Sequence, residues 1–239
     1  MPAEVKGEPV SIGNRSGVAT ARARFDAPHY DPPVATSRRS VSDRPDRPRV
    51  TTGMKKTEIE VKLRVEDREA VPARLATIGA ALVQAREIED NQLYDFPDFA
   101  LKTKGAMLRV RIQPSGSTLT YKEAPRVEGG AKVRDEIEVA VTSGETTATI
   151  LAKLGMRPLF RYQKYRAVYR YSDLLITIDE TPIGIFLELE GPKLLIDEVA
   201  GKLGYRSTDY IVKSYLELYR DHLRVRGQPL RDMVFDEKG

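Results

Sequence analysis

The sequence predicts an α+β fold in which eight mostly antiparallel strands close into a barrel and the helices flank it on the outside. The tetrapeptide EIEV occurs at residues 58–61 and again at 136–139. Each copy lies in a strand-like segment and is followed by an amphipathic helix, a glycine and three further strand-like segments. Two halves of four strands give eight, a number that can close around one small ligand.

The strand-like segments are recognised by alternation, which has the period of a half-buried strand. In residues 57–65, Ile59, Val61 and Leu63 take one side while Glu58 and Glu60 take the other. The first half continues with segments 82–96, 106–113 and 117–124. The second half comprises segments 132–139, 159–171, 173–181 and 184–191.

Four helices are predicted from apolar residues spaced three or four positions apart. Residues 68–80 stop at Gly79, and residues 143–155 run from Ser143, a favoured N-cap, to Gly155. Residues 192–204 also end in glycine. The last helix, at 213–224, is expected to bury Tyr215, Leu218 and Tyr219, with His222 as a surface or packing residue.

The two ends of the chain differ from the middle in composition and periodicity. Residues 1–53 are rich in Pro, Arg and Ser and have no periodicity, so we expect a disordered tail there. The functional chain is expected to begin at Met54. We therefore expect one folded domain at residues 54–226 and a C-terminal tail at 227–239.

The amino-acid composition excludes several classes of protein and of metal site. The chain has no apolar run of the roughly 18 residues that a membrane helix needs, so we expect a soluble, cytoplasmic protein. It has no cysteine and only two histidines, so a metal site must use mainly oxygen ligands, which favours Mg²⁺ with Mn²⁺ as a substitute. The net charge is +4, of which the first 53 residues carry +3, so no uniformly basic surface for nucleic acid is indicated.

The polar sides of the strands carry like-charged pairs two residues apart. These pairs are Glu58/Glu60, Lys62/Arg64, Arg109/Arg111, Glu136/Glu138, Lys164/Arg166 and Glu188/Glu190. One explanation is an ordinary solvated sheet face. The other is that the helices cover the outside, so that the charges point into the barrel, where they require partners. A polyanion bound together with a divalent cation would satisfy both signs of charge.

The ordered series of motifs resembles the CYTH domain, also called the triphosphate tunnel metalloenzyme fold. The segments TEIEVK, LRVR, LTYKEA, RDEIEV, KYR, ITIDETPIGIFLELEG and SYLELY follow one another as in that family and cover about residues 55–222. The resemblance implies a closed eight-stranded barrel whose tunnel binds a triphosphate.

The same resemblance implies roles for individual residues. The metal ligands would be Glu58, Glu60, Glu188 and Glu190. The phosphate contacts would be Lys62, Arg109, Arg111, Lys122, Arg134, Lys164 and Arg166. Catalysis would involve Lys62, Glu136, Glu138, Asp179 and Tyr94. Tyr94 corresponds to a tyrosine at the tunnel mouth, with packing in the core as the alternative.

The resemblance also implies an Mg²⁺- or Mn²⁺-dependent enzyme acting on ATP or tripolyphosphate. The short layout is most similar to the class IV adenylate cyclases, which convert ATP to cyclic AMP and pyrophosphate. Alternatives are an inorganic tripolyphosphatase, a nucleoside or thiamine triphosphate hydrolase, and a noncatalytic binder of triphosphate. The absence of tryptophan counts against a thiamine enzyme of the mammalian type. No membrane or nucleic-acid partner is expected, and a homodimer is left open.

Overall fold

The computed structural model describes residues 56–236, which all belong to the second of the two units into which the chain divides, Pro48–Gly239. The tail predicted at residues 1–53 and the start expected at Met54 lie outside the described residues.

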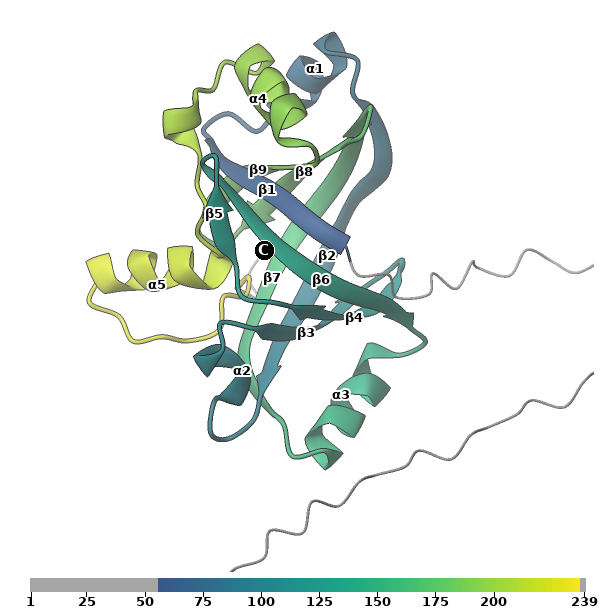
Figure 1. The fold of residues 1–239 in the computed structure, drawn as a ribbon, viewed down its shortest axis with the longest axis vertical. Helices are drawn as coiled ribbons and strands as arrows, with labels where there is room; N and C mark the ends of the chain where they lie inside the picture. Colours follow the sequence, from purple (N-terminus) through teal and green to yellow (C-terminus); the bar gives the residue numbers. More distant parts are fainter. Residues whose placement is uncertain (1–55, 237–239) are drawn as a thin grey trace, which may run out of the picture. The chain divides into compact units, whose positions relative to one another are not determined.

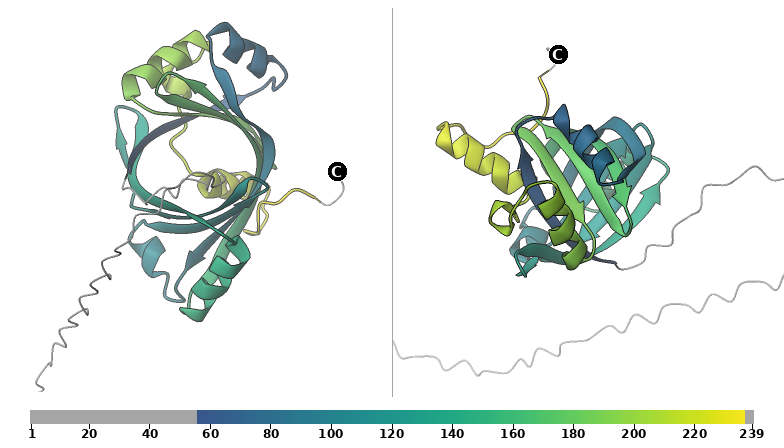
Figure 2. Two further views of the ribbon diagram at one scale, coloured as in Figure 1. Left: turned by 90° about the vertical axis from the view of Figure 1, so that its right-hand side faces the viewer. Right: turned by 90° about the horizontal axis from the view of Figure 1, so that it is seen from above.

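Eight long strands form the wall of a barrel. They are β1 (Lys56–Val65), β2 (Ala81–Asp95), β3 (Met107–Gln113), β4 (Gly116–Lys122), β6 (Ala131–Val141), β7 (Arg157–Tyr171), β8 (Leu174–Thr181) and β9 (Gly184–Glu190). Their order around the wall is β1-β9-β8-β7-β2-β3-β4-β6, and the antiparallel pairing of β1 with β6 closes the ring (Figures 1 and 2). The predicted closed, eight-stranded antiparallel barrel is confirmed.

A ninth strand, β5 (Arg126–Glu128), was not predicted. It forms a small arm that pairs with the start of β6 through a turn at Gly129 and Gly130, whose φ angles of 56° and 77° favour glycine. All three residues of β5 are exposed. A segment this short and this exposed shows no alternation in the sequence.

The four predicted helices are all present. They are α1 (Ala70–Thr77), α3 (Gly144–Lys153), α4 (Lys193–Lys202) and α5 (Tyr215–Val225). Ser143 caps α3 as predicted, since its Oγ accepts a hydrogen bond from the amide of Thr146 at 3.0 Å. Two short helices were not predicted, α2 (Ala100–Thr103) and the 3₁₀ turn η1 (Ser207–Asp209).

The helices cover parts of the outer surface of the wall, and the strands beneath them are buried on both faces. Helices α1 and α4 lie together over β1, β8 and β9, and α3 covers β3 and β4 (Figure 2). On β1, Val61 and Leu63 point outward into the apolar layer and are 0 % exposed. Glu60 and Lys62 point inward and are only 7 % and 3 % exposed. The charged side of each strand therefore faces the inside of the barrel rather than solvent.

Helix α5 lies across one end of the barrel (Figure 2). Its buried side chains Tyr215, Tyr219 and Leu223 pack with Phe160 and Phe186 from the wall. The prediction for this helix was right for the two tyrosines, whereas Leu218 and His222 are only half-buried and Leu223 is the third buried position.

The chain after α5 departs from the expected tail at residues 227–239. Met233 is fully buried, and its amide donates to the carbonyl of Arg161 at 3.0 Å while its carbonyl accepts from the amide of Gln163 at 2.8 Å. The ring of Phe235 lies 5.1 Å from that of Tyr165. The segment is therefore part of the folded unit as far as Phe235. Its few apolar residues do not reveal this because they pair with a strand some 70 positions away.

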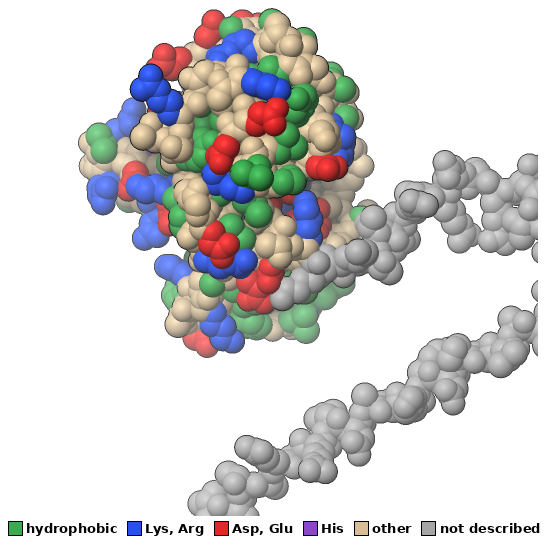
Figure 3. Space-filling model, turned by 45° about the horizontal axis from the view of Figure 1, so that its top comes forward, with side chains coloured by type: hydrophobic (Ala, Val, Ile, Leu, Met, Phe, Trp, Pro, Cys, Tyr) green, Lys and Arg blue, Asp and Glu red, His purple; other side chains and the backbone are tan. Residues whose placement is uncertain are grey.

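Two observations concern the outside of the molecule. No helix within residues 56–236 has the length and apolar character needed to span a membrane. On the face shown in Figure 3, the Lys and Arg side chains of the described residues are interspersed with Asp and Glu. That face carries no extended basic patch of the kind that nucleic acid prefers.

Candidate active site

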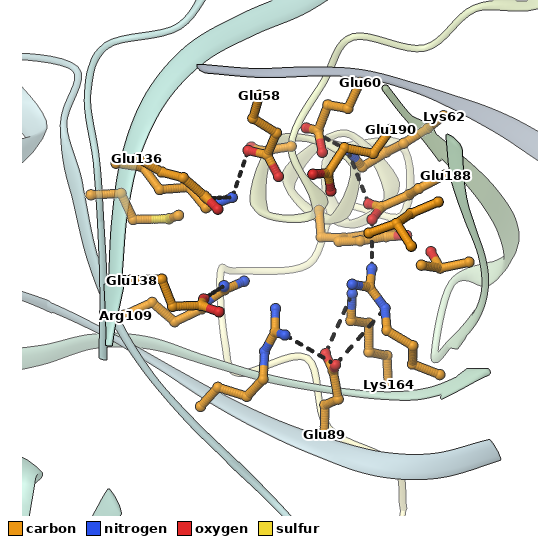
Figure 4. Close-up of a pocket in the computed structure, with 18 of the residues that line it drawn as sticks. Glu58, Glu60, Lys62, Glu89, Arg109, Glu136, Glu138, Lys164, Glu188 and Glu190 are labelled. Carbon is orange, nitrogen blue, oxygen red and sulfur yellow. Dashed lines mark hydrogen bonds and ion pairs between the residues drawn. The ribbon is translucent and has the colours of Figure 1, made fainter. Parts of the chain in front are cut away.

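The inside of the barrel holds a cavity of about 370 Å³ lined mostly by polar and charged side chains (Figure 4). We call this cavity the tunnel. All eight strands of the wall contribute side chains to it, and α5 contributes Tyr215. Alternation explains the composition, because residues two apart on a strand project to the same side.

One side of the tunnel is acidic. Glu58 and Glu60 of β1 lie beside Glu188 and Glu190 of β9, because the strand register aligns Glu60 with Glu190. Lys62 lies between two of these carboxylates, with its Nζ 3.1 Å from an oxygen of Glu60 and 3.1 Å from an oxygen of Glu188. Although burial lowers the pKa of Lys62, these two carboxylates raise it above its ordinary value.

Each carboxylate on this side has a cation partner. The Nζ of Lys122 lies 2.7 Å from Glu58 Oε2 and 2.6 Å from Glu136 Oε2. Two further ion pairs complete the set, Lys132 with Glu60 and Lys56 with Glu190. The acidic side of the tunnel is thus neutralised by lysines of the same protein.

The opposite side of the tunnel is basic and centred on Glu89, which is 1 % exposed (Figure 4). A guanidinium nitrogen of Arg111, Nζ of Lys164 and Nε of Arg166 lie 3.3, 3.5 and 3.9 Å from its carboxylate. Burial raises the pKa of Glu89, but these three cations lower it well below its ordinary value. Three positive charges thus surround Glu89, and one of them, Arg166, also pairs with Glu188 at 2.5 Å.

Asp179 lies behind this basic cluster. It is 0 % exposed and accepts hydrogen bonds from Lys164 at 2.8 Å, from Arg166 at 2.6 and 2.5 Å, and from the hydroxyl of Tyr215 at 2.7 Å. Burial and the charge of Asp179 raise the pKa of Tyr215 well above its ordinary value, so this hydroxyl stays protonated as the donor. Asp179 therefore orients the two cations.

Arg109 forms a third group with Thr120, Tyr162 and Glu138, whose carboxylate lies 3.5 Å from its guanidinium. It donates to Thr120 Oγ1 at 3.2 Å, and Thr120 in turn donates to Glu138 at 2.6 Å. The hydroxyl of Tyr162 lies 3.5 Å from the same guanidinium. This arrangement keeps Arg109 pointed into the tunnel.

Several buried polar atoms in the tunnel have no hydrogen-bond partner among the described residues. They include Arg109 Nε, Arg134 Nε, Thr177 Oγ1 and Glu89 Oε2. Buried polar groups are normally satisfied, so unpaired donors on a cation-lined wall indicate a site for an anionic ligand.

Comparison with known proteins identifies the family. The model of the CYTH domain family matches residues 56–215, which include all eight strands of the barrel wall. The chain belongs to the CYTH family.

Two relatives support the assignment. This CYTH protein is 28 % identical, over 67 % of its length and 97 % of the relative, to a protein of Methanocaldococcus jannaschii named "Putative adenylate cyclase". It is 27 % identical, over 72 % of its length and 93 % of the relative, to the adenylate cyclase CyaB of Aeromonas hydrophila.

Solved structures share the fold. A "putative adenylate cyclase" from Vibrio parahaemolyticus superposes with a TM-score of 0.62 at 19 % identity, covering 69 % of this chain and 98 % of that one. A Hippeastrum protein described as a "putative adenylyl cyclase" with a dominant triphosphatase activity superposes with a TM-score of 0.54 at 19 % identity, covering 72 % and 97 %.

The acidic side of the tunnel fits the divalent metal that CYTH triphosphate tunnel metalloenzymes use. Its donors are the carboxylate oxygens that hard cations prefer. Burial and the adjacent Glu58 raise the pKa of Glu190, which shows two carboxylates held close enough to repel each other. Among residues 56–236, no three acidic or histidine side chains are gathered on one point, since the glutamates lean toward their lysine partners.

Thirteen of the fifteen predicted site residues of this CYTH protein line the tunnel. They are Glu58, Glu60, Lys62, Arg109, Arg111, Lys122, Arg134, Glu136, Glu138, Lys164, Arg166, Glu188 and Glu190. Asp179 lies behind the lining. Tyr94 lies on the outer side of β2, packed against Val110, Leu151 and Met156. Since Glu89, Asn91 and Leu93 face inward, alternation turns Tyr94 outward, where it also lines a second cavity beside the tunnel. Its catalytic role stays a prediction.

The sequence analysis did not assign a role to four residues of the tunnel: Glu89, Lys132, Tyr162 and Tyr215. Alternation places Lys132 and Tyr162 on the same side of their strands as the predicted phosphate contacts, and both line the tunnel, although the resemblance gave them no role. Glu89 was obscured because the segment 82–96 carries charges on both faces. No local signal marks Tyr215, whose position depends on how α5 docks across the barrel.

Proposed function

We propose that this CYTH protein is an enzyme that binds the triphosphate of ATP in the tunnel and converts ATP to cyclic AMP and pyrophosphate. The observation that carries the proposal is the set of cations that line the tunnel, together with the buried guanidinium nitrogens Arg109 Nε and Arg134 Nε, which have no hydrogen-bond partner among the described residues. Phosphate oxygens accept from arginine in the same bidentate geometry that Asp179 shows with Arg166. Family membership and the two adenylate cyclase names support the choice of reaction.

The residues would divide the work as follows. Arg109, Arg111, Lys164 and Arg166 would bind phosphate oxygens and stabilise the charge that develops on the leaving pyrophosphate. Asp179 and Tyr215 would hold these cations in place. The reaction requires little covalent chemistry from the protein, so orientation of the phosphate chain is the main contribution.

We further propose that Glu58, Glu60, Glu188 and Glu190 hold Mg²⁺ or Mn²⁺. A bound cation would neutralise phosphate charge and acidify the attacking hydroxyl or water. Lys62 and Lys122, which pair with these glutamates, would turn toward the phosphates. The cytoplasmic location expected from the composition stays a prediction.

The second candidate is a triphosphatase in which water attacks the terminal phosphorus. It is favoured by the lining of the tunnel itself, in which β1, β3, β4, β6 and β7 each offer a cation for phosphates and nothing demands a base or sugar. Both reactions use the same cations and differ in which phosphorus is attacked.

One assay separates the candidates. Purified protein is incubated with Mg²⁺ or Mn²⁺ and either ATP or tripolyphosphate, and the products are identified. We expect cyclic AMP and pyrophosphate from ATP. Orthophosphate from either substrate without cyclic AMP would overturn the cyclase and support the triphosphatase. Thermal stabilisation by both ligands without turnover would leave a noncatalytic binder.

A further inference from the structure

A second cavity of about 480 Å³ lies beside the tunnel, on the side of the barrel where β5, α2 and α5 gather (Figure 1). We call it the groove. In contrast to the tunnel, its surface is largely apolar, with Leu93, Phe160 and Leu159 from the wall. Val127 of the β5 arm and Leu230, after α5, also line it, although they are 61 % and 53 % exposed.

The groove and the tunnel are adjacent. Six residues line both cavities: Leu93, Met107, Lys132, Arg134, Ser214 and Leu216. Of these shared residues, Lys132 and Arg134 are nearly buried, at 4 % and 9 % exposed, and Arg134 Nε has no hydrogen-bond partner among the described residues. The groove therefore lies next to the proposed phosphate site, where the uncharged portion of a ligand held in the tunnel would be placed.

The lining of the groove is positively charged overall, which favours neutral over cationic organic groups. Five cations line it, Lys102, Lys132, Arg134, Lys213 and Arg220, against the carboxylates of Asp95 and Glu217. Both carboxylates are engaged by backbone amides. Asp95 accepts from the amides of Leu101 and Lys102, each at 2.9 Å, and Glu217 accepts from the amide of Ser214 at 2.7 Å. A neutral ring suits this apolar floor and basic rim, whereas a cationic ring such as a thiazolium is repelled.

We propose that the groove binds the base and sugar of a nucleoside triphosphate whose phosphates occupy the tunnel. This inference rests on the proposed function and deepens it, because it assigns the substrate class to nucleotides rather than inorganic polyphosphate or thiamine triphosphate. The cavity is of a size suited to small ligands, and an apolar surface with a few polar groups is typical of their sites. The exposed apolar side chains of Val127 and Leu230, which serve no core, act as the walls of the base site.

The test compares two ligands on one pair of variants. Binding of α,β-methylene-ATP and of tripolyphosphate, each with Mg²⁺, is measured by calorimetry on the full chain. In the double variant Val127→Ser/Leu230→Ser, we expect the Kd for α,β-methylene-ATP to rise about tenfold and the Kd for tripolyphosphate to stay unchanged. The matched control is Leu154→Ser/Leu194→Ser, which removes equally exposed apolar side chains, 66 % and 86 % exposed, outside the groove.

The outcomes distinguish failure of the proposed base site from failure of the proposed function. If the groove variant weakens both ligands equally, or neither, the groove does not bind the base, while the tunnel assignment stands. Tight binding of tripolyphosphate to the wild type without binding of α,β-methylene-ATP also overturns the nucleotide assignment alone. If the wild type binds neither ligand, the proposed function itself fails. Unchanged thermal unfolding of both double variants shows that the comparison is made between folded proteins.

Discussion

At the scale of single residues, Glu89 is the most informative side chain of the tunnel. It is buried among three cations, and removing one partner of such a group leaves uncompensated charge. The tunnel thus contains a permanent internal anion in the region where we propose that phosphate binds. Its contribution to stability can be measured separately from any activity.

We predict that Glu89→Gln lowers the free energy of unfolding by about 3 kcal/mol at pH 7. The folded-state pKa of Glu89 lies below the ordinary value of 4.5, so its contribution is complete above that value and is lost as the pH falls through the acid range. The difference between wild type and variant in urea unfolding should therefore shrink below about pH 4. Glu69→Gln, at an exposed position, is the control. A difference that stays constant with pH would contradict this account.

The proposed metal ligands give a second prediction at this scale. Glu58→Gln and Glu190→Gln should each reduce Mg²⁺-dependent turnover by about 100-fold or more while leaving the fold intact, because each removes one carboxylate from the donor set. Turnover across a Mg²⁺ titration and circular dichroism are the measurements. Undiminished activity in both variants would refute the metal assignment.

At the scale of elements, the segment after α5 shows how a part of the chain distant in sequence packs against the barrel wall. Met233 is fully buried against β7 and α5. We predict that Met233→Ala lowers the free energy of unfolding by about 2–5 kcal/mol. Leu230→Ala, three residues earlier and 53 % exposed, should change it by less than about 0.5 kcal/mol. Equal effects of the two substitutions would show that this segment does not pack as described.

Prediction from sequence succeeded for elements whose signal is local. Alternation is clearest on β1, because its outer face packs in the apolar core and its inner face lines the charged tunnel. Helix α3 likewise shows its cap in Ser143. Prediction failed where position depends on distant packing. Met233 belongs to the folded unit only because β7 lies beside it, and Tyr215 reaches the tunnel only because α5 crosses the barrel end. For Tyr94 the two kinds of evidence differ, since alternation along β2 turns it out of the tunnel while the resemblance implies the tunnel mouth, and its side chain lines the cavity beside the tunnel.

At the scale of the whole molecule, the question is which residues stability and turnover require. The family match begins at residue 56, and residues 1–53 show no periodicity from which a core could be built. We predict that deleting residues 1–53 changes the melting temperature by less than about 2 °C and leaves turnover unchanged. Differential scanning calorimetry and the ATP assay test this. A large loss of either would extend the functional unit beyond the barrel.

The lysine–glutamate pairs inside the barrel have a thermodynamic consequence. Lys62 and Lys122 each hold two carboxylates, so a phosphate that takes up one of these lysines releases the carboxylates for a cation. Filling the barrel is then an exchange of ion pairs within the protein for contacts between its charged side chains and the external ions. Anion and cation must therefore raise each other's affinity by the same factor. Neither ion alone should bind as tightly as the two together.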